Sequence, residues 1–333
     1  MTEKHLHGRE EPIVDPGIPL IDTHHHLYIR PNVHYMLPEF LADVGAGHDI
    51  RASVYLETRF MSRSSGPDHL RPIGEIEFAN GLGAMGASGF FGPCRFAAAI
   101  VAHADLTQPT AQLEDYLDHA RRAAPDRLRG VRQITMDSPE LSIFAHLAHP
   151  PRQGLLNDPM FRRNLRLLAP RGLGFDAAIF YRQMPDLMTL ADENPETTII
   201  LNHLGFALRL KGEDPAEVFA AWGRNLRDLA RRPNVMCKIG GLGSAYWGFG
   251  FHEDDRVIPS TELAAAWRPY VETAVEAFGA DRCMLESNYP PDGRSCGYVP
   301  MWNAFKLCLA GASAEEKAAI CHGTAARVYR ITI

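Results

Sequence analysis

Short apolar runs alternate with longer amphipathic stretches along most of the chain. The apolar runs are rich in β-branched and aromatic residues and are bounded by Gly, Pro or polar clusters, which predicts β-strands. Eight strands are predicted, over Pro19–Asp22, Ala52–Glu57, Phe96–Val101, Gly130–Ile134, Gly174–Ile179, Thr198–Asn202, Val235–Ile239 and Cys283–Glu286. Between them, apolar residues recur every three or four positions, as on one face of a helix. The clearest helices are predicted over Pro109–Ala124, Pro215–Arg231, Thr261–Phe278 and Ala314–Val328.

The regular alternation of strands and helices predicts an α/β fold in which helices cover a parallel sheet. Eight strands close a (β/α)8 TIM barrel, and 333 residues is an ordinary length for such a barrel. A doubly wound open sheet would show a similar alternation. However, the first predicted strand is not followed by a Gly-x-Gly-x-x-Gly turn, which disfavours a dinucleotide-binding sheet. We therefore predict a single barrel domain.

We expect residues 1–17 to form an N-terminal arm and residues 18–333 to form the barrel. The arm contains proline and glycine and is predicted to be extended and weakly ordered. The region Met61–Pro93, after the second predicted strand, is rich in glycine and is predicted to be an irregular insertion. Because it also contains Phe and Met, it forms either a lid over the barrel mouth or an insertion without regular structure.

Composition and charge limit the classes of partner. The formal net charge is -6, and Lys and Arg form no run longer than two residues, so no surface for nucleic acid or an anionic membrane is expected. No apolar run reaches the roughly 20 residues that a membrane span needs. The six cysteines are scattered without a Cys-x-x-Cys pair, which favours free thiols in a reducing compartment. We expect a cytoplasmic protein that acts on a small-molecule substrate.

A cluster of histidines ends the first predicted strand, in the segment Asp22–His26. Because alternate side chains of a strand point to the same face, Asp22, His24 and His26 should project into one space while His25 points elsewhere. Two imidazoles on one face can chelate a divalent metal such as zinc or polarise one carbonyl group. The motif therefore predicts a catalytic or metal site at the mouth of the barrel.

Further segments extend a family resemblance over most of the chain. They are Leu128–Arg132, Leu201–Gly205, Cys237–Leu242, Glu286–Pro290 and Thr324–Arg330. Together with the histidine motif, they resemble the strand ends of the amidohydrolase superfamily, and most closely the branch containing 2-pyrone-4,6-dicarboxylate lactonase and the sugar lactonases. The resemblance implies an active site at the C-terminal ends of the strands. It also implies that His203 is a metal ligand or carbonyl polariser alongside His24 and His26.

One departure from this superfamily concerns the general base. Most members end the eighth strand with an aspartate that serves as base, whereas the matching position here is Asn288, whose amide cannot take a proton. Glu286 and Asp292 are alternative bases, since a carboxylate in a barrel mouth can act once its neighbours tune its pKa. Glu286 could instead be a structural partner of Arg132 or Lys238.

A second departure concerns the metal. The fifth predicted strand leads into Tyr181–Gln183 instead of the histidine found in metal-rich members. A metal at His24, His26 and His203 would then have three protein nitrogens, which suffice for a catalytic zinc with one open position. The lactonase-like branch also includes members that work without a metal. One divalent metal such as zinc and metal-independent activity therefore both stay open.

Cationic groups near the predicted mouth suggest an acidic substrate. Arginine grips carboxylates through two parallel hydrogen bonds, and we expect Arg132 to do so because it lies in a strand-end motif. The other candidate substrate contacts are Tyr181, Arg182, Lys238, His252 and Arg294. The aromatic segment Tyr246–Phe251 forms either a wall of the pocket or an interface between subunits, and a homodimer is the expected assembly.

The leading functional prediction is hydrolysis of a lactone or related carbonyl compound that carries a carboxylate. In this reaction His24, His26 and His203 stabilise the oxyanion, and Glu286 or Asp292 handles the proton. One alternative is a metal-dependent non-oxidative decarboxylase of a carboxylated ring compound, although that chemistry usually relies on the missing aspartate and histidine. A third hypothesis is a binding protein that kept the barrel and lost catalysis. The presence of His24, His26 and His203 argues against it.

Overall fold

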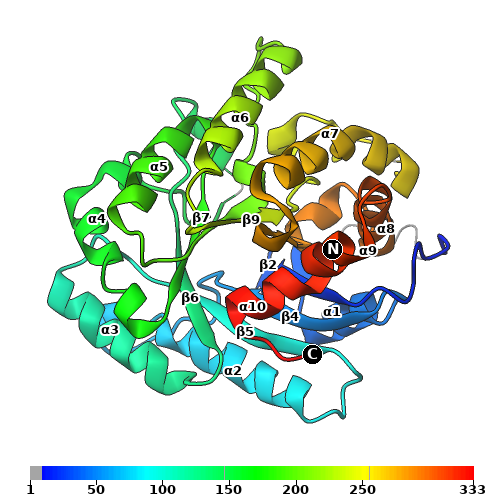
Figure 1. Cartoon of the computed structure of the whole chain (residues 1–333). Coiled ribbons are helices and arrows are strands. Elements are labelled where there is room, and N and C mark those ends of the chain that lie inside the picture. The colour runs from blue at the N-terminus through cyan, green and yellow to red at the C-terminus, as the bar shows by residue number, and fades with distance from the viewer. Residues whose placement is uncertain (1–9, 146, 255) are drawn as a thin grey trace.

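The structure is a computed structural model and describes residues 10–145, 147–254 and 256–333 (Figure 1). Its centre is a sheet of eight parallel strands, each hydrogen-bonded to the next in chain order. The strands are β1 (Leu20–His25), β4 (Ile50–Leu56), β5 (Arg95–His103), β6 (Leu128–Ile134), β7 (Gly174–Ala178), β8 (Ile199–Leu201), β9 (Val235–Ile239) and β10 (Cys283–Leu285). Each of the eight predicted strands overlaps one of these, so their predicted order is confirmed. A small antiparallel hairpin that was not predicted, β2 (Tyr28–Arg30) and β3 (Val33–Tyr35), follows β1.

The two edges of the sheet meet beside β1, which closes the (β/α)8 TIM barrel. The amide of Asn288 donates to the carbonyl oxygen of His24 at 2.8 Å, and the amide of His26 donates to the carbonyl oxygen of Tyr289 at 2.8 Å. We call this contact the closing seam. The histidine motif forms one side of the seam, and the segment after β10 forms the other.

Helices surround the strands (Figure 1). They are α1 (Leu37–Val44), α2 (Ile73–Ala87), α3 (Thr110–Ala123), α4 (Pro159–Leu165), α5 (Met184–Glu193), α6 (Pro215–Leu229), α7 (Ser260–Phe278), α8 (Tyr298–Cys308), α9 (Ala314–Ala318) and α10 (Thr324–Tyr329). The four predicted helices are present, the last of them as α9 and α10 joined by a short π-helical turn. Among the described residues, no helix is both long enough and apolar enough to cross a bilayer.

The prediction of an irregular insertion over Met61–Pro93 is wrong in its central part, which forms α2 packed against β5. The glycines of this helix permit a close approach. A Cβ atom on Gly83 would lie 2.6 Å from the carbonyl oxygen of Ala97, and one on Gly86 would lie 2.9 Å from the backbone of Phe96. The glycines therefore serve a contact between helix and strand, not a lid over the barrel mouth.

Replacing Gly83 by alanine should lower the free energy of unfolding by about 1–3 kcal/mol, because the added methyl group would push α2 away from β5. The matched control is Gly81→Ala in the same helix, where a Cβ atom meets nothing within 4 Å. There the lost backbone freedom of glycine should raise the free energy of unfolding by about 0.5–1 kcal/mol. Urea unfolding measures both changes, and equal effects at the two positions would contradict the close packing of α2.

The end of the barrel opposite the histidines is filled by the C-terminal helix. Small and branched side chains of the strands, such as Ala52, Val101 and Ile200, form a buried cluster with Ala325 and Tyr329 of α10. Figure 1 shows α10 lying across the ends of β4 and β5. Apolar packing therefore closes one end of the barrel and leaves the other end for chemistry.

The ion pair between Lys238 and Asp176 is fully buried inside the barrel. The Nζ atom of Lys238 on β9 is 2.7 Å from Oδ1 of Asp176 on β7, and both side chains are inaccessible to solvent. Asp176 also accepts hydrogen bonds from Nδ2 of Asn202 at 2.8 Å and from the hydroxyl of Tyr329 at 3.1 Å. The carboxylate on β7 thus contacts β9, the turn after β8 and the C-terminal helix.

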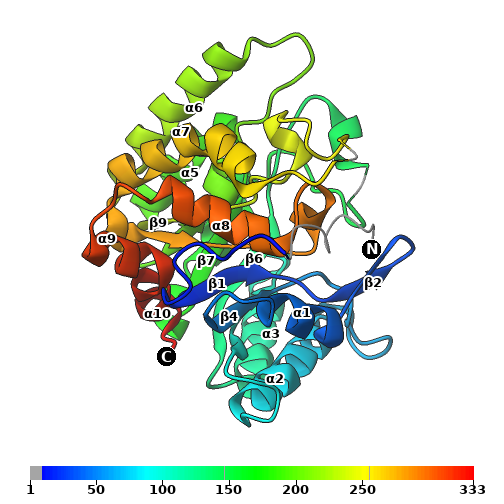
Figure 2. The ribbon, with the colours of Figure 1, turned by 90° about the vertical axis from the view of Figure 1, so that its right-hand side faces the viewer.

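The described part of the N-terminal arm, residues 10–17, contains no helix or strand and runs beside α8 (Figure 2). The amide of Val14 donates to Oδ1 of Asn303 at 2.8 Å, and Nζ of Lys306 donates to the carbonyl oxygens of Val14 and Asp15 at 2.9 Å. Hydrogen bonds to α8 therefore hold this segment on the barrel. The other residues of the predicted arm, 1–9, lie outside the described residues.

Candidate active site

His24 and His26 lie side by side at the C-terminal end of β1, as strand alternation predicts. Their Nε2 atoms are 3.1 Å apart, whereas His25 points away and stacks on Phe40 with ring centroids 4.3 Å apart. Burial lowers the pKa of His24 and of His26 well below the usual value for histidine, because it removes the charged form from water. Both imidazoles are therefore neutral near pH 7.

Asp22, which was expected to share this space, has other partners. Its carboxylate accepts hydrogen bonds from the amide of Ser287 at 2.9 Å and from the hydroxyl of Ser287 at 2.6 Å. Burial raises the pKa of Asp22 to about 6, although these two hydrogen bonds favour the ionised form. Asp22 therefore braces the closing seam beside the histidines.

His203 joins the histidine pair from the end of β8. Its ring centroid is 4.4 Å from that of His24. His203 and Leu204 both adopt left-handed backbone conformations, with φ of 55° and 56°, which are uncommon for residues with a Cβ atom and cluster at functional sites. Gly241 makes room for this turn, since a Cβ atom there would lie 2.6 Å from Nδ1 of His203.

Glu286 connects two of the three histidines. Its Oε1 atom accepts from Nδ1 of His203 at 2.6 Å and from the amide of His203 at 3.0 Å. Its Oε2 atom is 2.9 Å from Nδ1 of His24, although these two atoms are not aligned for a hydrogen bond. The carboxylate is fully buried. Glu286 is thus a partner of histidines, and the alternative prediction that pairs it with Arg132 or Lys238 is wrong.

The hydrogen-bond partners determine which nitrogen of each imidazole carries the proton. Nδ1 of His26 faces a carbonyl oxygen of β4 at 3.0 Å, so His26 donates from Nδ1. Nε2 of His24 is 3.1 Å from Nη1 of Arg132. Because arginine can only donate, Nε2 of His24 is the acceptor, and the proton of His24 is on Nδ1. His203 donates from Nδ1 to Glu286. The neutral His24 and His26 therefore present unprotonated Nε2 atoms, and His203 directs its Nδ1 proton to Glu286.

The donor atoms of this site suit a divalent cation. The lone pairs on Nε2 of His24 and His26 approach each other within 3.1 Å with no proton between them, an arrangement that a cation would stabilise. In addition, the donor atoms of His24, His203 and Glu286 all lie within 4.8 Å of one another. Imidazole nitrogens and carboxylate oxygens are the ligands that zinc commonly takes. The chemistry of the donor set therefore fits a divalent metal.

Arg132 extends from β6 to the histidines and is held by Glu57 after β4. Its Nε atom donates to Oε1 of Glu57 at 2.8 Å, and its Nη2 atom donates to the carbonyl oxygen of Glu57 at 3.0 Å. Burial alone would raise the pKa of the Glu57 carboxyl, but Arg132 and His103 hold it below the usual value. Glu57 is not among the predicted site residues. The sequence feature that could have identified Glu57 is its position as a carboxylate at the end of an apolar strand.

Asn288 and Asp292 form a pair next to the closing seam. Asn288 has a left-handed backbone with φ of 50°, and its Nδ2 atom donates to Oδ1 of Asp292 at 2.8 Å. Oδ2 of Asp292 accepts from the amide of Gly243 at 2.9 Å. Burial raises the pKa of Asp292 to about 8. Because both of its oxygens are engaged, Asp292 holds Asn288 in position.

Several predicted substrate contacts have partners elsewhere. Lys238 is fully buried beside Asp176, so its ammonium group cannot reach a substrate at the mouth. Arg182 forms a partly exposed ion pair with Glu213 at 2.5 Å, and its guanidinium lies 4.5 Å from the ring centroid of the buried Tyr181. The two cationic residues predicted near the fifth and seventh strands, Arg182 and Lys238, are thus both paired with carboxylates of the protein.

Positive charge does gather on the His26 side of the site. The guanidinium of Arg30 lies 4.8 Å from the ring centroid of Tyr28, and that ring is 6.5 Å from the ring of His26. Burial raises the pKa of Tyr28, and the charges of Arg30 and Arg294 both oppose this rise. Arg30 and Arg294, the cationic flank, thus both act on the hydroxyl of Tyr28.

Aromatic rings gather on the His203 side. The ring of Phe206 is 4.8 Å from that of His203, and Tyr246 and Trp247 follow at 5.1 Å and 6.1 Å from Phe206. These three residues, the aromatic flank, are buried. The exposed His252, in the same loop, is 3.6 Å from a carboxylate oxygen of its neighbour Glu253.

His25, which lies outside this polar cluster, allows a test of how a buried histidine changes folding stability with pH. Its Nε2 atom is 2.9 Å from the hydroxyl of Ser53, and burial lowers its pKa to about 3. The unfolded chain binds this proton near pH 6.5, whereas the folded chain binds it only near pH 3. The folded state therefore loses stability as the pH falls through this window, by about 1.4 kcal/mol per pH unit.

We expect His25→Phe, which keeps the stacking on Phe40, to lose less folding stability than the parent protein when the pH is lowered. Urea unfolding near pH 7 and near pH 5 should show a smaller loss of stability in the variant by about 2 kcal/mol or somewhat less. Equal losses in the variant and the parent protein would mean that His25 does not contribute.

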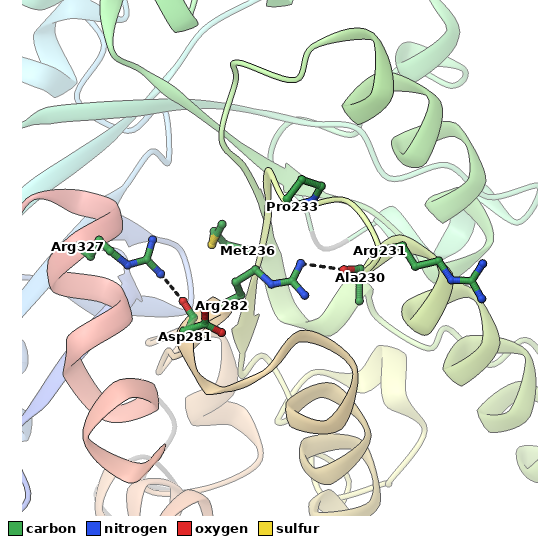
Figure 3. A pocket seen from close by; sticks show the side chains of 7 residues that line it. All are labelled: Ala230, Arg231, Pro233, Met236, Asp281, Arg282 and Arg327. Atoms are coloured by element: carbon green, nitrogen blue, oxygen red, sulfur yellow. Dashed lines mark hydrogen bonds between the residues drawn. The ribbon is translucent and has the colours of Figure 1, made fainter. Parts of the chain in front are cut away.

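Two surface hollows lie away from the histidines. The one in Figure 3 has a volume of about 440 Å³ and lies at the opposite end of the barrel, where β9 and β10 begin. Its Arg282 and Arg327 donate to backbone carbonyl groups, and Arg231 points away from both. The other, of about 720 Å³, lies between Tyr181 and α6. Neither contains the buried donor atoms of the histidine cluster, which is the candidate active site.

Comparison with known proteins agrees with this arrangement. The sequence pattern of the family described as Amidohydrolase matches residues 21–331, almost the whole barrel. The chain belongs to the amidohydrolase family. A relative described as the uncharacterised protein y4mH of Sinorhizobium fredii is 33% identical over 91% of this chain and 88% of its own length. The L-fucono-1,5-lactonase of Burkholderia multivorans is 26% identical over 93% of this chain and 96% of its own length.

Solved structures of amidohydrolases share the fold. A crystal structure of an amidohydrolase from Burkholderia multivorans with bound zinc matches with a TM-score of 0.67 and 24% identity, over 94% of this chain and 99% of that chain. The predicted resemblance to the lactonase-like branch of the amidohydrolase superfamily is therefore confirmed, and so is the barrel. As an amidohydrolase, the protein is a hydrolytic enzyme.

Proposed function

We propose that this amidohydrolase hydrolyses a lactone that carries a carboxylate. One observation carries the proposal: the buried carboxylate of Glu286 lies against Nδ1 of both His24 and His203. Because Nε2 of His24 accepts from Arg132, this contact leaves Nε2 of His203 as the base. The likeness to an L-fucono-1,5-lactonase along almost its whole length supports the class of reaction.

His203 is the proposed general base, and Glu286 acts through it. Nε2 of His203 takes a proton from water as the water oxygen attacks the lactone carbonyl carbon. The carboxylate of Glu286, 2.6 Å from Nδ1 of His203, stabilises the imidazolium that forms, as a buried carboxylate does in other carboxylate–histidine pairs. This proposal replaces direct proton transfer to Glu286 or Asp292. Oε1 of Glu286 and both oxygens of Asp292 accept hydrogen bonds within the protein, and Oε2 of Glu286 is buried 2.9 Å from Nδ1 of His24.

Arg132 is placed to stabilise the negative charge that develops on the carbonyl oxygen. Its guanidinium reaches the histidines through Nη1, and its other nitrogens are fixed by Glu57. A donor held in place before the reaction is more effective than one that must reorient. The tetrahedral intermediate then breaks its bond to the ring oxygen, which takes the proton from Nε2 of His203. The product is an open-chain hydroxy acid.

A divalent metal would be held by His24, His26 and His203, with Glu286 orienting two of these imidazoles from Nδ1. When bound, such an ion supplies Lewis-acid polarisation of the carbonyl and lowers the pKa of water. A carboxylate behind a ligating histidine raises the basicity of that ligand and fixes its orientation. The contacts of Glu286 described above are therefore useful for a metal ligand as well as for a base.

The two flanks of the site support an anionic, ring-shaped substrate. The cationic flank, Arg30 and Arg294, acts on Tyr28, whose ring is 6.5 Å from that of His26, and arginine recognises carboxylates well. The aromatic flank is buried beside His203 and would form an apolar wall for a planar or cyclic compound. A lactone bound between them would present its carboxylate to the arginines and its carbonyl group to the histidines.

A proton-release assay tests the proposal with carboxylated lactones and with neutral sugar lactones of the same ring size. We expect turnover of at least one carboxylated lactone with kcat/KM about 10-fold or more above that of its neutral counterpart. His203→Ala should abolish this turnover. Release of carbon dioxide from carboxylated phenols without any lactone hydrolysis would favour the decarboxylase alternative. Tight binding without turnover would favour the binding protein.

A further inference from the structure

A positively charged group already lies against the histidine donors. Nη1 of Arg132 donates to Nε2 of His24 at 3.1 Å. Nε2 of His26 is also 3.1 Å from Nε2 of His24. A lone pair that accepts a hydrogen bond from a guanidinium cannot bind a metal at the same time. A metal ligated by His24 would sit about 2 Å from that nitrogen, so it would compete with Nη1 for the same position.

The guanidinium of Arg132 is held so that it cannot move away easily. Its Nε and Nη2 atoms make two hydrogen bonds to a single residue, Glu57, through the carboxylate and the backbone carbonyl. Both side chains are buried, with exposed fractions of 6% and 4%. Displacing the guanidinium would break both bonds and leave a buried carboxylate without its partner, which is strongly unfavourable.

We propose that Arg132 competes with divalent metal for the lone pair of His24 and thereby sets the metal affinity of the site. The guanidinium, fixed by Glu57, is the resident cation of the His24–His26 pair. A metal ion binds His24 only when Nη1 gives up its hydrogen bond, and it then lies beside a like charge. Arg132 thus weakens metal binding at a donor set that is otherwise suited to it.

Cobalt(II) titration tests this inference, because Co²⁺ bound to histidine nitrogens absorbs visible light. We compare the parent protein with Arg132→Met, which keeps much of the side-chain volume and removes the charge and the donors. The variant should bind Co²⁺ about 100-fold more tightly, because a buried like charge close to the ion is removed. Arg182→Met, the same change at a partly exposed ion pair, should leave the affinity unchanged.

Two further variants separate competition from other causes. Arg132→Met frees the carboxylate of Glu57, which could attract the ion by itself, so Glu57→Gln/Arg132→Met removes that carboxylate and should keep the gain in affinity. This double variant also avoids an unpaired buried charge, so it serves as the test if the single variant does not fold. Adding His24→Ala to it should remove the gain, because the freed lone pair belongs to His24.

Unchanged or weaker Co²⁺ binding by the folded Glu57→Gln/Arg132→Met protein would overturn the proposal. A gain that survives His24→Ala would overturn it as well, since the ion would then bind elsewhere. The readout is metal affinity, and no substrate is involved. Failure of this inference therefore leaves the lactone hydrolase proposal intact, and failure to find a lactone substrate leaves this inference intact.

Discussion

Glu286→Gln is expected to lower kcat/KM for any lactone substrate by about 1,000-fold. Replacing a carboxylate that orients a catalytic histidine by its amide has cost as much as about 10,000-fold in other enzymes, whereas partners behind metal-bound histidines cost about 10- to 100-fold. The glutamine has the same shape, but it offers one acceptor oxygen and one amide donor. Nδ1 of His203 donates to this side chain, and the protonated Nδ1 of His24 lies 2.9 Å from its other oxygen. An amide group in place of that carboxylate therefore forces one imidazole to reverse its proton position or to lose its partner.

The matched control for this prediction is Glu193→Gln, which makes the same change in an ion pair with Arg162 at the surface. Its kcat/KM should stay within about 2-fold of the parent value, because surface ion pairs contribute little. Circular dichroism and thermal unfolding establish whether the barrel of each variant is intact. If a folded Glu286→Gln protein keeps more than about one tenth of the activity, His203 does not act through Glu286.

Asp176→Asn is expected to lower the free energy of unfolding by about 3–5 kcal/mol. The substitution keeps the shape of the side chain but leaves the ammonium of Lys238 buried without a counter-charge. The loss should be large because Lys238 is fully inaccessible to solvent and its Nζ atom is 2.7 Å from the carboxylate. Urea unfolding followed by tryptophan fluorescence measures the change.

The double variant Asp176→Asn/Lys238→Met identifies the cause of this loss. Removing the lysine as well eliminates the unpaired charge, so the double variant should recover most of the stability lost by Asp176→Asn. Lys238→Met alone leaves Asp176 with its neutral donors Asn202 and Tyr329 and should cost less than Asp176→Asn. Additive losses in the three proteins would mean that the two residues do not interact in the way the geometry indicates.

The strands and the first histidines could be predicted because their signals are local. A parallel strand buried on both faces is a short apolar run, and the run before His24 is followed by a change to polar residues at the end of the strand. Alternation along one strand is enough to place His24 beside His26 and to turn His25 away. The position of His203 follows in the same way from the apolar run of the sixth strand.

The partners of the site residues could not be predicted, because they come from distant strands. Glu57 and Arg132 are 75 residues apart, and His203 and Glu286 are 83 residues apart. No local pattern distinguishes which carboxylate faces which cation across a barrel. Lys238 was therefore expected at the mouth, although its strand directs it to Asp176 within the interior.

The helix α2 was missed for a different reason. Each glycine makes a helix less favourable by about 1 kcal/mol relative to alanine, so a glycine-rich stretch is predicted to be a loop. In the folded protein that disadvantage is offset because Gly83 and Gly86 let the helix lie close to β5. Tertiary contact, which the sequence does not display, decides the structure of this segment.

The closing seam has a consequence for how the enzyme loses activity. The amides of His26 and Asn288 donate backbone hydrogen bonds that join the two edges of the sheet, so their exchange with deuterated water reports on opening of the barrel. The same residues adjoin the histidine cluster. Opening of the seam would therefore displace the catalytic side chains before the rest of the barrel unfolds, and inactivation in mild denaturant should coincide with exchange of these two amides.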